Sequence, residues 1–429
     1  MADKLKTVLL AVLVALSLLQ SYLLIYDRPE NRPLNRTEYV RTELRGLQAD
    51  VQDLLFPVDM VIHFGNNEHA LLYPNSTFFE LILRMLKGKT FEGLTAERPF
   101  IQDFGSMRRE MIGIELRYMT PVPLRLTMLD QAFPPDRFGE TTRVRKLWFY
   151  QQPNQAAVKL MLFTEDGVYE VAQNAVLPDD LRQYVLFGQF LQPRFETEDG
   201  ELYVPAGPIQ LGDLVEVGYG MFSSDQLRNS LFADPSISRS ILQQDGTEMI
   251  TDGKRGLQID YTRMWMSFND PIAITDQVRQ ADDLAAALAS AVQFVNQHGG
   301  WNGKYVLSGF EHGEWASHEF RFTQLYDGIP VIAAEGTPLG TIRVATRQGL
   351  VTEYERSLVN LNIASLRRFR YELPGGEKLK AQLERTGRER IAALFPSYVP
   401  IFEETHVELL PRWAVRLKTG GIAILGWGG

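Results

Sequence analysis

The segment LSGFEHGEWASHEFRFTQLYDGIPV, residues 307–331, contains the residue types that bind metals or exchange protons. It holds two of the chain's six histidines, His312 and His318, together with four acidic side chains. A metal site needs ligands that converge, from i, i+4 positions on a helix or i, i+2 positions on a strand. These histidines are six residues apart and fit neither spacing. Phe320 and Phe322 alternate with polar neighbours, so the sequence favours a strand over a metal or acid-base site.

The other candidates for chemistry are also interpreted as structural. His63 lies in the apolar strand VDMVIHF, and Glu403 and Glu404 beside His406 are typical of a solvated loop. No G-x-S-x-G, G-x-x-x-x-G-K-[ST] or strand-linked G-x-G-x-x-G pattern occurs in the sequence. The chain has no cysteine, which excludes thiolate nucleophiles and disulfides. We therefore assign no catalytic, metal or cofactor-binding residue, and expect no cofactor and no enzymatic activity.

Length and charge limit the possible partners. The 429 residues are 45% hydrophobic, enough to bury more than one core. The 44 basic residues are outnumbered by 53 acidic ones, giving a formal net charge of −9. Such a chain is a poor match for the phosphates of nucleic acid, which is excluded as an expected partner.

A run without charges near the start predicts a membrane anchor. Thr7 to Tyr26 reads TVLLAVLVALSLLQSYLLIY, long enough as a helix to cross a hydrocarbon core of about 30 Å. A cleaved signal peptide with Ala15 and Ser17 as its small residues is the alternative, but the apolar run continues past Ser17. We expect a single-pass protein of the cell membrane, with residues 1–6 as a cytoplasmic tail and the body outside the cytoplasm. Five arginines follow the anchor and would favour a cytoplasmic body by charge alone, although large domains translocate largely regardless of charge.

The predicted anchor has a polar face. Ser17, Gln20 and Ser21 are spaced i, i+3, i+4 and so share one side of a helix. Interhelical hydrogen bonds to such residues stabilise association by about 0.6 to 2 kcal/mol. Ala11 and Ala15, on another side, would permit close approach of a second helix. These five residues are candidates for binding a partner helix; the alternative is a passive anchor whose Gln20 reaches water.

A second apolar pattern follows a linker over residues 27–37, which contains two prolines. Five residues spaced four and three apart form a stripe on an expected helix. The stripe covers about two heptads, so packing on its own domain is favoured over a coiled coil with a partner. Its members are Val40, Leu44, Leu47, Val51 and Leu54.

Beyond the linker the sequence predicts an α+β body of mostly antiparallel sheets with helices. We expect domains at residues 38–140, 141–271 and 272–429, the last two of similar topology. In the third, a helix is expected to begin near Thr275 and to end at Gly299-Gly300, and another to span Glu377 to Leu394.

Part of the third domain resembles a known family. YVLSGFEHGEWASHEFRFTQLYDGIPV followed by TIRVATRQGLVTEYERSL is similar to the YycH family of regulatory proteins, whose relative YycI has a similar C-terminal pattern. The specific match covers about fifty residues, and the single anchor and the size of the body extend the likeness over the whole chain.

The resemblance implies an elongated, extracytoplasmic, three-domain protein without enzymatic activity. Such a protein would act with a YycI-like partner, through transmembrane helices, on the sensor histidine kinase YycG (WalK), whose response regulator controls cell-wall metabolism. The alternatives are a membrane-tethered cell-wall enzyme and an extracellular ligand-binding module.

Overall fold

The computed structural model describes Ser17 and residues 46–426, except 100–102, 135–136, 140–141, 154, 192–193, 198, 272–282, 314–315 and 334–338, and the side chains of 363–365. Residues 1–40 and 41–429 are two separate units. The predicted anchor, including Ala11, Ala15, Gln20 and Ser21, lies outside the described residues, as do the linker and Val40 and Leu44. Ser17 alone is described there, as a helical, exposed residue. No helix in the described part of the chain has the length and apolarity needed to span a bilayer.

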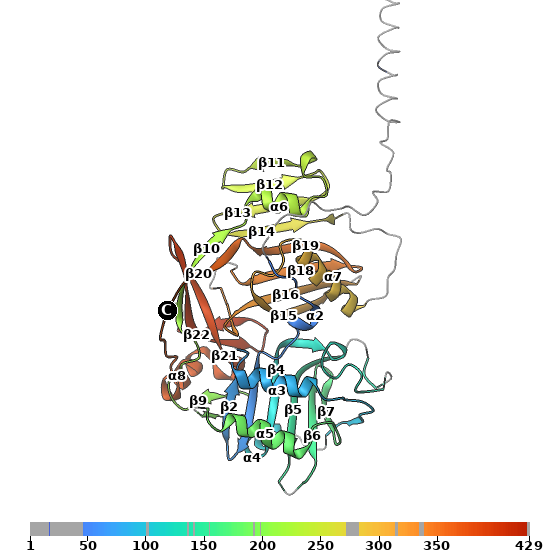
Figure 1. Ribbon diagram of the computed structural model, residues 1–429, viewed down its shortest axis with the longest axis vertical. Helices are drawn as coiled ribbons and strands as arrows, with labels where there is room; N and C mark the ends of the chain where they lie inside the picture. Colours follow the sequence, from blue (N-terminus) through green and yellow to red (C-terminus); the bar gives the residue numbers. More distant parts are fainter. Residues whose placement is uncertain are drawn as a thin grey trace, which may run out of the picture. The chain divides into compact units, whose positions relative to one another are not determined.

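The first sheet has nine strands in the order β3-β7-β6-β5-β4-β1-β2-β8-β9, and every neighbouring pair is antiparallel (Figure 1). The expected boundary at 140/141 separates β4 from β5, which are joined by backbone hydrogen bonds in this sheet. In chain order its elements are β1 (Asp59–Gly65), β2 (Glu68–Leu72), α3 (Thr77–Lys87), β3 (Ala96–Glu97), α4 (Phe104–Glu110), β4 (Ile112–Pro123), η1 (Leu124–Leu126), β5 (Arg143–Gln151), β6 (Val158–Thr164), β7 (Gly167–Val171), α5 (Pro178–Gly188), β8 (Phe195–Glu196) and β9 (Val204–Pro205).

The two faces of this sheet differ in chemistry. Side chains alternate along each strand, so Ile62, Ile114 and Leu147 share one face and pack in the apolar core with α3 and α5. The opposite face carries Asp59, His63, Glu115, Arg117 and Lys146. These polar side chains are mostly buried, and the four charged ones belong to the cluster described below.

The second sheet repeats one order of elements. A helix and four successive antiparallel strands (α6, β11–β14) are followed by another such set (α7, β15, β16, β18, β19), and the two sets meet edge to edge at β14 and β19. The expected boundary at 271/272 lies between them. The elements are α6 (Ser224–Leu231), η2 (Pro235–Ile237), β11 (Arg239–Leu242), β12 (Thr247–Thr251), β13 (Gly256–Asp260), β14 (Trp265–Asn269), α7 (Leu284–Gln297), β15 (Lys304–Gly313), β16 (Ser317–Tyr326), β17 (Ile329–Pro330), β18 (Thr341–Arg347) and β19 (Leu350–Ser357).

The third sheet has the order β20-β10-β22-β21, with β23 paired to β22. It combines strands from distant parts of the chain, because β10 precedes α6 whereas the others follow β19. Its elements are β10 (Leu214–Met221), β20 (Val359–Phe369), α8 (Gly376–Thr386), η4 (Arg388–Arg390), β21 (Ile391–Phe402), β22 (His406–Leu417) and β23 (Ile422–Ile424).

One helix limit differs from expectation, and another lies outside the described residues. The helix expected to reach Leu394 ends at Thr386, because Gly387 adopts a left-handed conformation with φ of 86° and the apolar residues after Arg390 form β21. The expected start near Thr275 lies outside the described residues. Within them α7 begins after Asp283, whose side chain accepts hydrogen bonds from the Ala285 and Ala286 amides at 2.9 and 3.1 Å.

The apolar stripe is only partly helical. Helix α2 covers Val51–Leu54, with Leu54 buried, whereas Leu47 is 73% exposed and outside any helix. The helix expected through Leu47 does not form, because the chain there pairs with Trp301: each backbone N–H donates to the other's carbonyl at 2.9 Å.

Three further contacts fix this segment, which we call the 46–49 clamp, against the connection between α7 and β15. A Cβ on Gly46 would lie 2.2 Å from the Gly299 carbonyl oxygen, so the two backbones touch. The Asn296 side chain bonds Ala49 twice: Oδ1 accepts from the Ala49 amide at 3.0 Å, and Nδ2 donates to its carbonyl at 2.9 Å. The same Oδ1 accepts from Trp301 Nε1 at 2.8 Å.

Substituting Asn296→Ala removes the side-chain half of the clamp, so the amides of Leu47 and Ala49 should exchange with solvent about tenfold or more faster by hydrogen exchange. The matched control is Gln297→Ala, the exposed neighbour on α7. Equal protection in the two variants would show that Asn296 does not hold this segment.

Candidate functional site

A cluster of paired charges occupies the second face of the first sheet. Asp59 on β1 lies opposite Arg117 on β4, and Arg117 lies opposite Lys146 on β5. Arg108 comes from α4, which packs against β1, and Glu115 from β4. Glu201 comes from the loop between β8 and β9. The six side chains, three acidic and three basic, are called the ionic cluster: Asp59, Arg108, Glu115, Arg117, Lys146 and Glu201.

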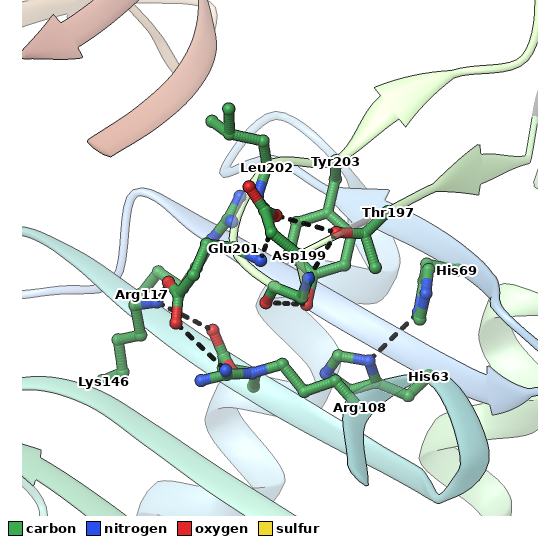
Figure 2. Close-up of polar contacts among 12 residues, drawn as sticks. His63, His69, Arg108, Arg117, Lys146, Thr197, Asp199, Glu201, Leu202 and Tyr203 are labelled. Atoms are coloured by element: carbon green, nitrogen blue, oxygen red, sulfur yellow. Dashed lines mark hydrogen bonds and ion pairs between the residues drawn. The ribbon is translucent and has the colours of Figure 1, made fainter. Parts of the chain in front are cut away.

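Short contacts connect its members. Arg117 donates from Nε and Nη2 to the two Asp59 oxygens at 2.5 and 3.0 Å, a bidentate pair. Arg108 donates to Glu115 at 2.6 Å and to Glu201 at 3.0 Å. Lys146 forms an ion pair with Glu201 and lies 3.8 Å from Glu115. Figure 2 shows Arg108 and Lys146 both pointing to the Glu201 carboxylate.

The loop that carries Glu201 is shaped by its own hydrogen bonds. Asp199 accepts from the amides of Glu201 and Leu202 at 2.8 and 2.9 Å, and Thr197 accepts from the Gly200 amide at 2.8 Å (Figure 2). Gly200 has φ of 74°, and a Cβ there would lie 2.5 Å from Gly105 Cα. Only glycine permits this approach, which places the loop on the first turn of α4 beside Arg108.

The charges of the cluster keep Glu115 and Glu201 ionised. Burial would raise the pKa of Glu115, but Arg108, Lys146 and Arg117 outweigh it and the pKa lies below its usual range. The same holds for Glu201, where Lys146 and then Arg108 oppose the effect of burial on the pKa. A balanced, mutually paired set of this kind is suited to holding elements together, since each buried charge already has a partner.

Two buried histidines lie on the same face. His63 and His69 are opposite each other on β1 and β2, with their Nδ1 atoms 3.1 Å apart (Figure 2). Both rings are fully buried, and they pack edge-on to the Tyr203 ring. Burial, and then the neighbouring His69, lower the pKa of His63 well below its ordinary value. Burial lowers the pKa of His69 to about 4, with a smaller upward contribution from Glu115.

A cavity of about 1030 Å³ opens beside the ionic cluster. The middle of β4, the start of β5, the end of β6 and the loop at 199–201 line one side, together with Arg117, Lys146 and Glu201 from the cluster. The other side is formed by η4, the first half of β21 and the end of β22.

The structure confirms that His318 lies on a strand, and it places His312 on the strand before it. The two are six positions apart in sequence, but β15 and β16 form a hairpin in which they are direct partners, and their Nδ1 atoms lie 3.4 Å apart. Pairing across the hairpin therefore brings the two histidines together, although their spacing fits neither one helix nor one strand.

One other group has the residue types of a metal site. Glu216 on β10 and His406 and Glu408 on β22 each place one possible ligand atom within 4.8 Å of the others. All three are partly exposed, and the Arg367 guanidinium already pairs with Glu216. An arginine on one carboxylate competes with a cation for it, so we assign no metal here. Glu403 and Glu404 are exposed, as expected.

Sequence reasoning missed the ionic cluster. The signal was present in part: Asp59 and His63 in VDMVIHF, and Glu115 and Arg117 in IGIELRYM, are spaced by even numbers and must share a face of their strands. The sequence of these strands suggests that the polar face is exposed to solvent. In the structure it is covered by a loop that includes Glu201 and Tyr203, about eighty residues further along the chain.

Comparison with known proteins decides the family. The sequence matches the profile described as "YycH protein, N-terminal domain" over residues 3–185 and that described as "YycH protein, C-terminal domain" over residues 199–423. The chain belongs to the YycH family. The resemblance found in the sequence is thereby confirmed. The ionic cluster joins the two matched regions, because Glu201 lies in the second and the other members lie in the first.

A curated relative and a solved structure, both YycH of Bacillus subtilis, cover most of the chain. The "Two-component system WalR/WalK regulatory protein YycH" of Bacillus subtilis (strain 168) is 21% identical over 444 residues, which are 97% of this chain and 95% of the relative. The crystal structure of YycH from Bacillus subtilis aligns with a TM-score of 0.68 and 18% identity over 88% of this chain and 98% of that one. The second likeness shows a shared fold of mostly antiparallel sheets with helices.

Breaking the ionic cluster should destabilise the protein. Asp59→Asn leaves the Arg117 guanidinium buried without its bidentate partner, which should cost about 3 to 5 kcal/mol of the free energy of unfolding. The measurement is denaturant unfolding of the purified chain. The control is Glu372→Gln, which removes an exposed pair with Arg370 at 3.5 Å and should change little. Comparable losses in the two variants would contradict the structural role of the cluster.

Because the buried histidines are neutral in the folded chain, the free energy of unfolding should fall as the pH is lowered. Because the pKa of His69 is about 4 in the folded chain and about 6.5 when unfolded, its contribution is complete above pH 6.5 and lost as pH falls toward 4. From pH 7 to pH 5 the free energy of unfolding should drop by about 2 kcal/mol from His69 alone. Burial also lowers the pKa of His298 to about 4, so that residue adds to the drop.

The test compares unfolding of the native chain and of His69→Gln at pH 7 and pH 5. Glu115 and Glu201 contribute little to the difference, because their unfolded pKa is near 4.5 and their folded pKa is lower still. The variant should keep a shallower slope from His63 and His298. An unchanged slope would show that His69 is not held neutral in the folded state.

Proposed function

We propose that this chain is a membrane-anchored, extracytoplasmic regulator of a WalK-like (YycG-like) sensor histidine kinase that controls cell-wall metabolism. The observation that supports this is that both family profiles match the chain, together with the name of the relative as a WalR/WalK regulatory protein. In this proposal residues 1–6 are cytoplasmic, Thr7 to Tyr26 cross the membrane, and the body acts outside the cytoplasm with a YycI-like protein.

The 46–49 clamp supports a mechanical route for regulation. The chain leaves the proposed anchor through a proline-containing linker and is fixed at the α7–β15 connection by backbone pairing and by Asn296. Force or displacement of the body would therefore reach the anchor through this attachment. A change of kinase output then requires that the anchor helix pack differently against the kinase helices in its two states.

The proposed contact with those helices is the face formed by Ser17, Gln20 and Ser21, with Ala11 and Ala15 as a second, close-packing side. A glutamine amide in hydrocarbon favours a polar partner on a neighbouring helix. The role is regulatory and not catalytic in this proposal. The charges of the ionic cluster pair with one another, which favours a structural role for the cluster over acid-base chemistry.

The experiment moves one amide around the helix. Gln20→Leu should change WalR-dependent transcription at constant protein level, because it removes the polar contact. The matched control is the double variant Leu19→Gln with Gln20→Leu, which keeps composition and hydropathy but turns the amide about 100° along the helix. We expect the double variant to behave like Gln20→Leu. Native output from both variants would contradict the proposed face, and restored output in the double variant alone would show that only the presence of an amide matters.

A further inference from the structure

The cavity beside the ionic cluster is built by irregular strands. In a regular strand successive side chains point to opposite faces, so only alternate residues can line a cavity. Here β5 has a bulge between Val144 and Lys146, and the adjacent residues Arg145 and Lys146 both line the cavity. Bulges re-aim side chains and are common beside functional sites.

The other two strands behave in the same way. On β4 the register with β5 shifts after Arg117, and three successive residues, 117–119, line the cavity. On β21 the register with β22 shifts between Ile391 and Ala393, and residues 391–396 line it. Ala393 at this bulge is the direct partner of Arg416 on β22. Three independent strands therefore break their alternation at one place.

The cations of this cavity are not all neutralised. Arg117 is paired with Asp59 and Lys146 with Glu201. Arg145, Arg416 and Lys418 also line it, and their side chains form no hydrogen bond or ion pair with another residue in the described part of the chain. Besides Asp59 and Glu201, four carboxylates line the cavity. Glu165 pairs with Arg143, and Asp199 accepts from the backbone amides of its own loop. Glu384 and Glu389 are solvent-exposed, where water and salt screen their charge.

Of these three cations, Arg416 is the least exposed to water, so its charge is the least favourable without a partner. It is partly buried, and burial followed by the charge of Arg145 lowers its pKa to about 10, with Asp59 opposing this shift and Arg117 adding to it. At neutral pH the guanidinium still has its proton. A desolvated cation next to two others is unfavourable until an anion joins it.

The rest of the lining is apolar. Met119, Phe163 and residues 391–396, of sequence IAALFP, contribute hydrophobic surface next to the cationic side. The volume of about 1030 Å³ is at the upper end of the range of roughly 300–1000 Å³ that is usual for sites of small molecules.

We propose that this cavity binds a small amphipathic anion, with a phosphate or carboxylate paired to Arg416 and Arg145 and an apolar body against Met119, Phe163 and β21. The site gives the body a ligand of defined chemistry, beyond the regulatory role proposed above. Bound there, the ligand would join the first and third sheets, since its lining comes from both.

The test is calorimetric titration of the purified full-length chain in a nonionic detergent. The probes 1-naphthyl phosphate and 1-naphthoate have both an anionic group and an apolar ring. The probe 1-naphthol has only the apolar ring, and inorganic phosphate has only the charge. We expect at least one of the first two probes to bind about tenfold or more tightly than naphthol or phosphate, because the cationic and the apolar sides of the cavity then both contribute. Equal binding of naphthol or of phosphate, or no binding of any probe, would overturn the proposal.

Variants locate the binding. Arg416→Gln should weaken it about tenfold or more and raise the thermal midpoint of the empty protein, because an unpaired cation is removed. Arg145→Gln, at an exposed residue whose loss should not affect folding, should weaken it too. Arg239→Gln is the control and should bind as the native chain does, because Arg239 on β11 is exposed and forms no ion pair in the described part of the chain. Unchanged binding in Arg145→Gln and Arg416→Gln would overturn the proposal, and none of these titrations involves the kinase, so their failure leaves the proposed regulation intact.

Discussion

The pairing of charges on the second face of the first sheet is the constraint on which the rest of the body depends. Asp59, Glu115, Arg117 and Arg108 are buried in strands and a helix near the N-terminus, and a buried ion without a partner costs several kcal/mol. Glu201 completes the set from the beginning of the second family region. The loop that carries it must therefore lie on α4, and the chain that follows leads into β9 and on to the third sheet. There the first sheet packs against α8 and the third sheet in one apolar core, which includes Val61, Leu71, Leu379 and Trp413.

Much of the fold was predictable from local patterns. The α+β class, the antiparallel hairpins and the turn at Asp327-Gly328 follow from alternation and turn residues that act within a few positions. Non-local contacts decided the remainder. Leu47 fits a helical stripe but pairs with Trp301, more than two hundred residues away. The apolar residues after Arg390 fit a helical pattern, but in the structure they form strand β21, which pairs with β22. The domain boundaries expected at 140/141 and 271/272 stay predictions. The first lies between β4 and β5, which pair in one sheet, and the second lies between β14 and α7.

In the candidate sites, too, local patterns were predictable from the sequence and non-local contacts were not. The histidines of the 307–331 segment were recognised as strand residues, while their pairing across the hairpin was missed, because it depends on which strand lies alongside. The ionic cluster and the cavity were invisible for a related reason: the sequence indicates which residues share a face but not what covers it. The anchor face at Ser17, Gln20 and Ser21 rests on helical periodicity and stays a prediction, as does the orientation of the chain in the membrane.

The central claim is that this YycH-family chain acts through side-by-side contact of its anchor with other membrane helices. The most direct test introduces a photo-crosslinking amino acid at Gln20, and separately at Leu19, in the full chain expressed in cells with the native kinase, followed by identification of the adducts. The account predicts an adduct between position 20 and the sensor kinase or a YycI-like protein, and a much weaker one from position 19. The same products from both positions, or no protein adduct from position 20, would contradict it.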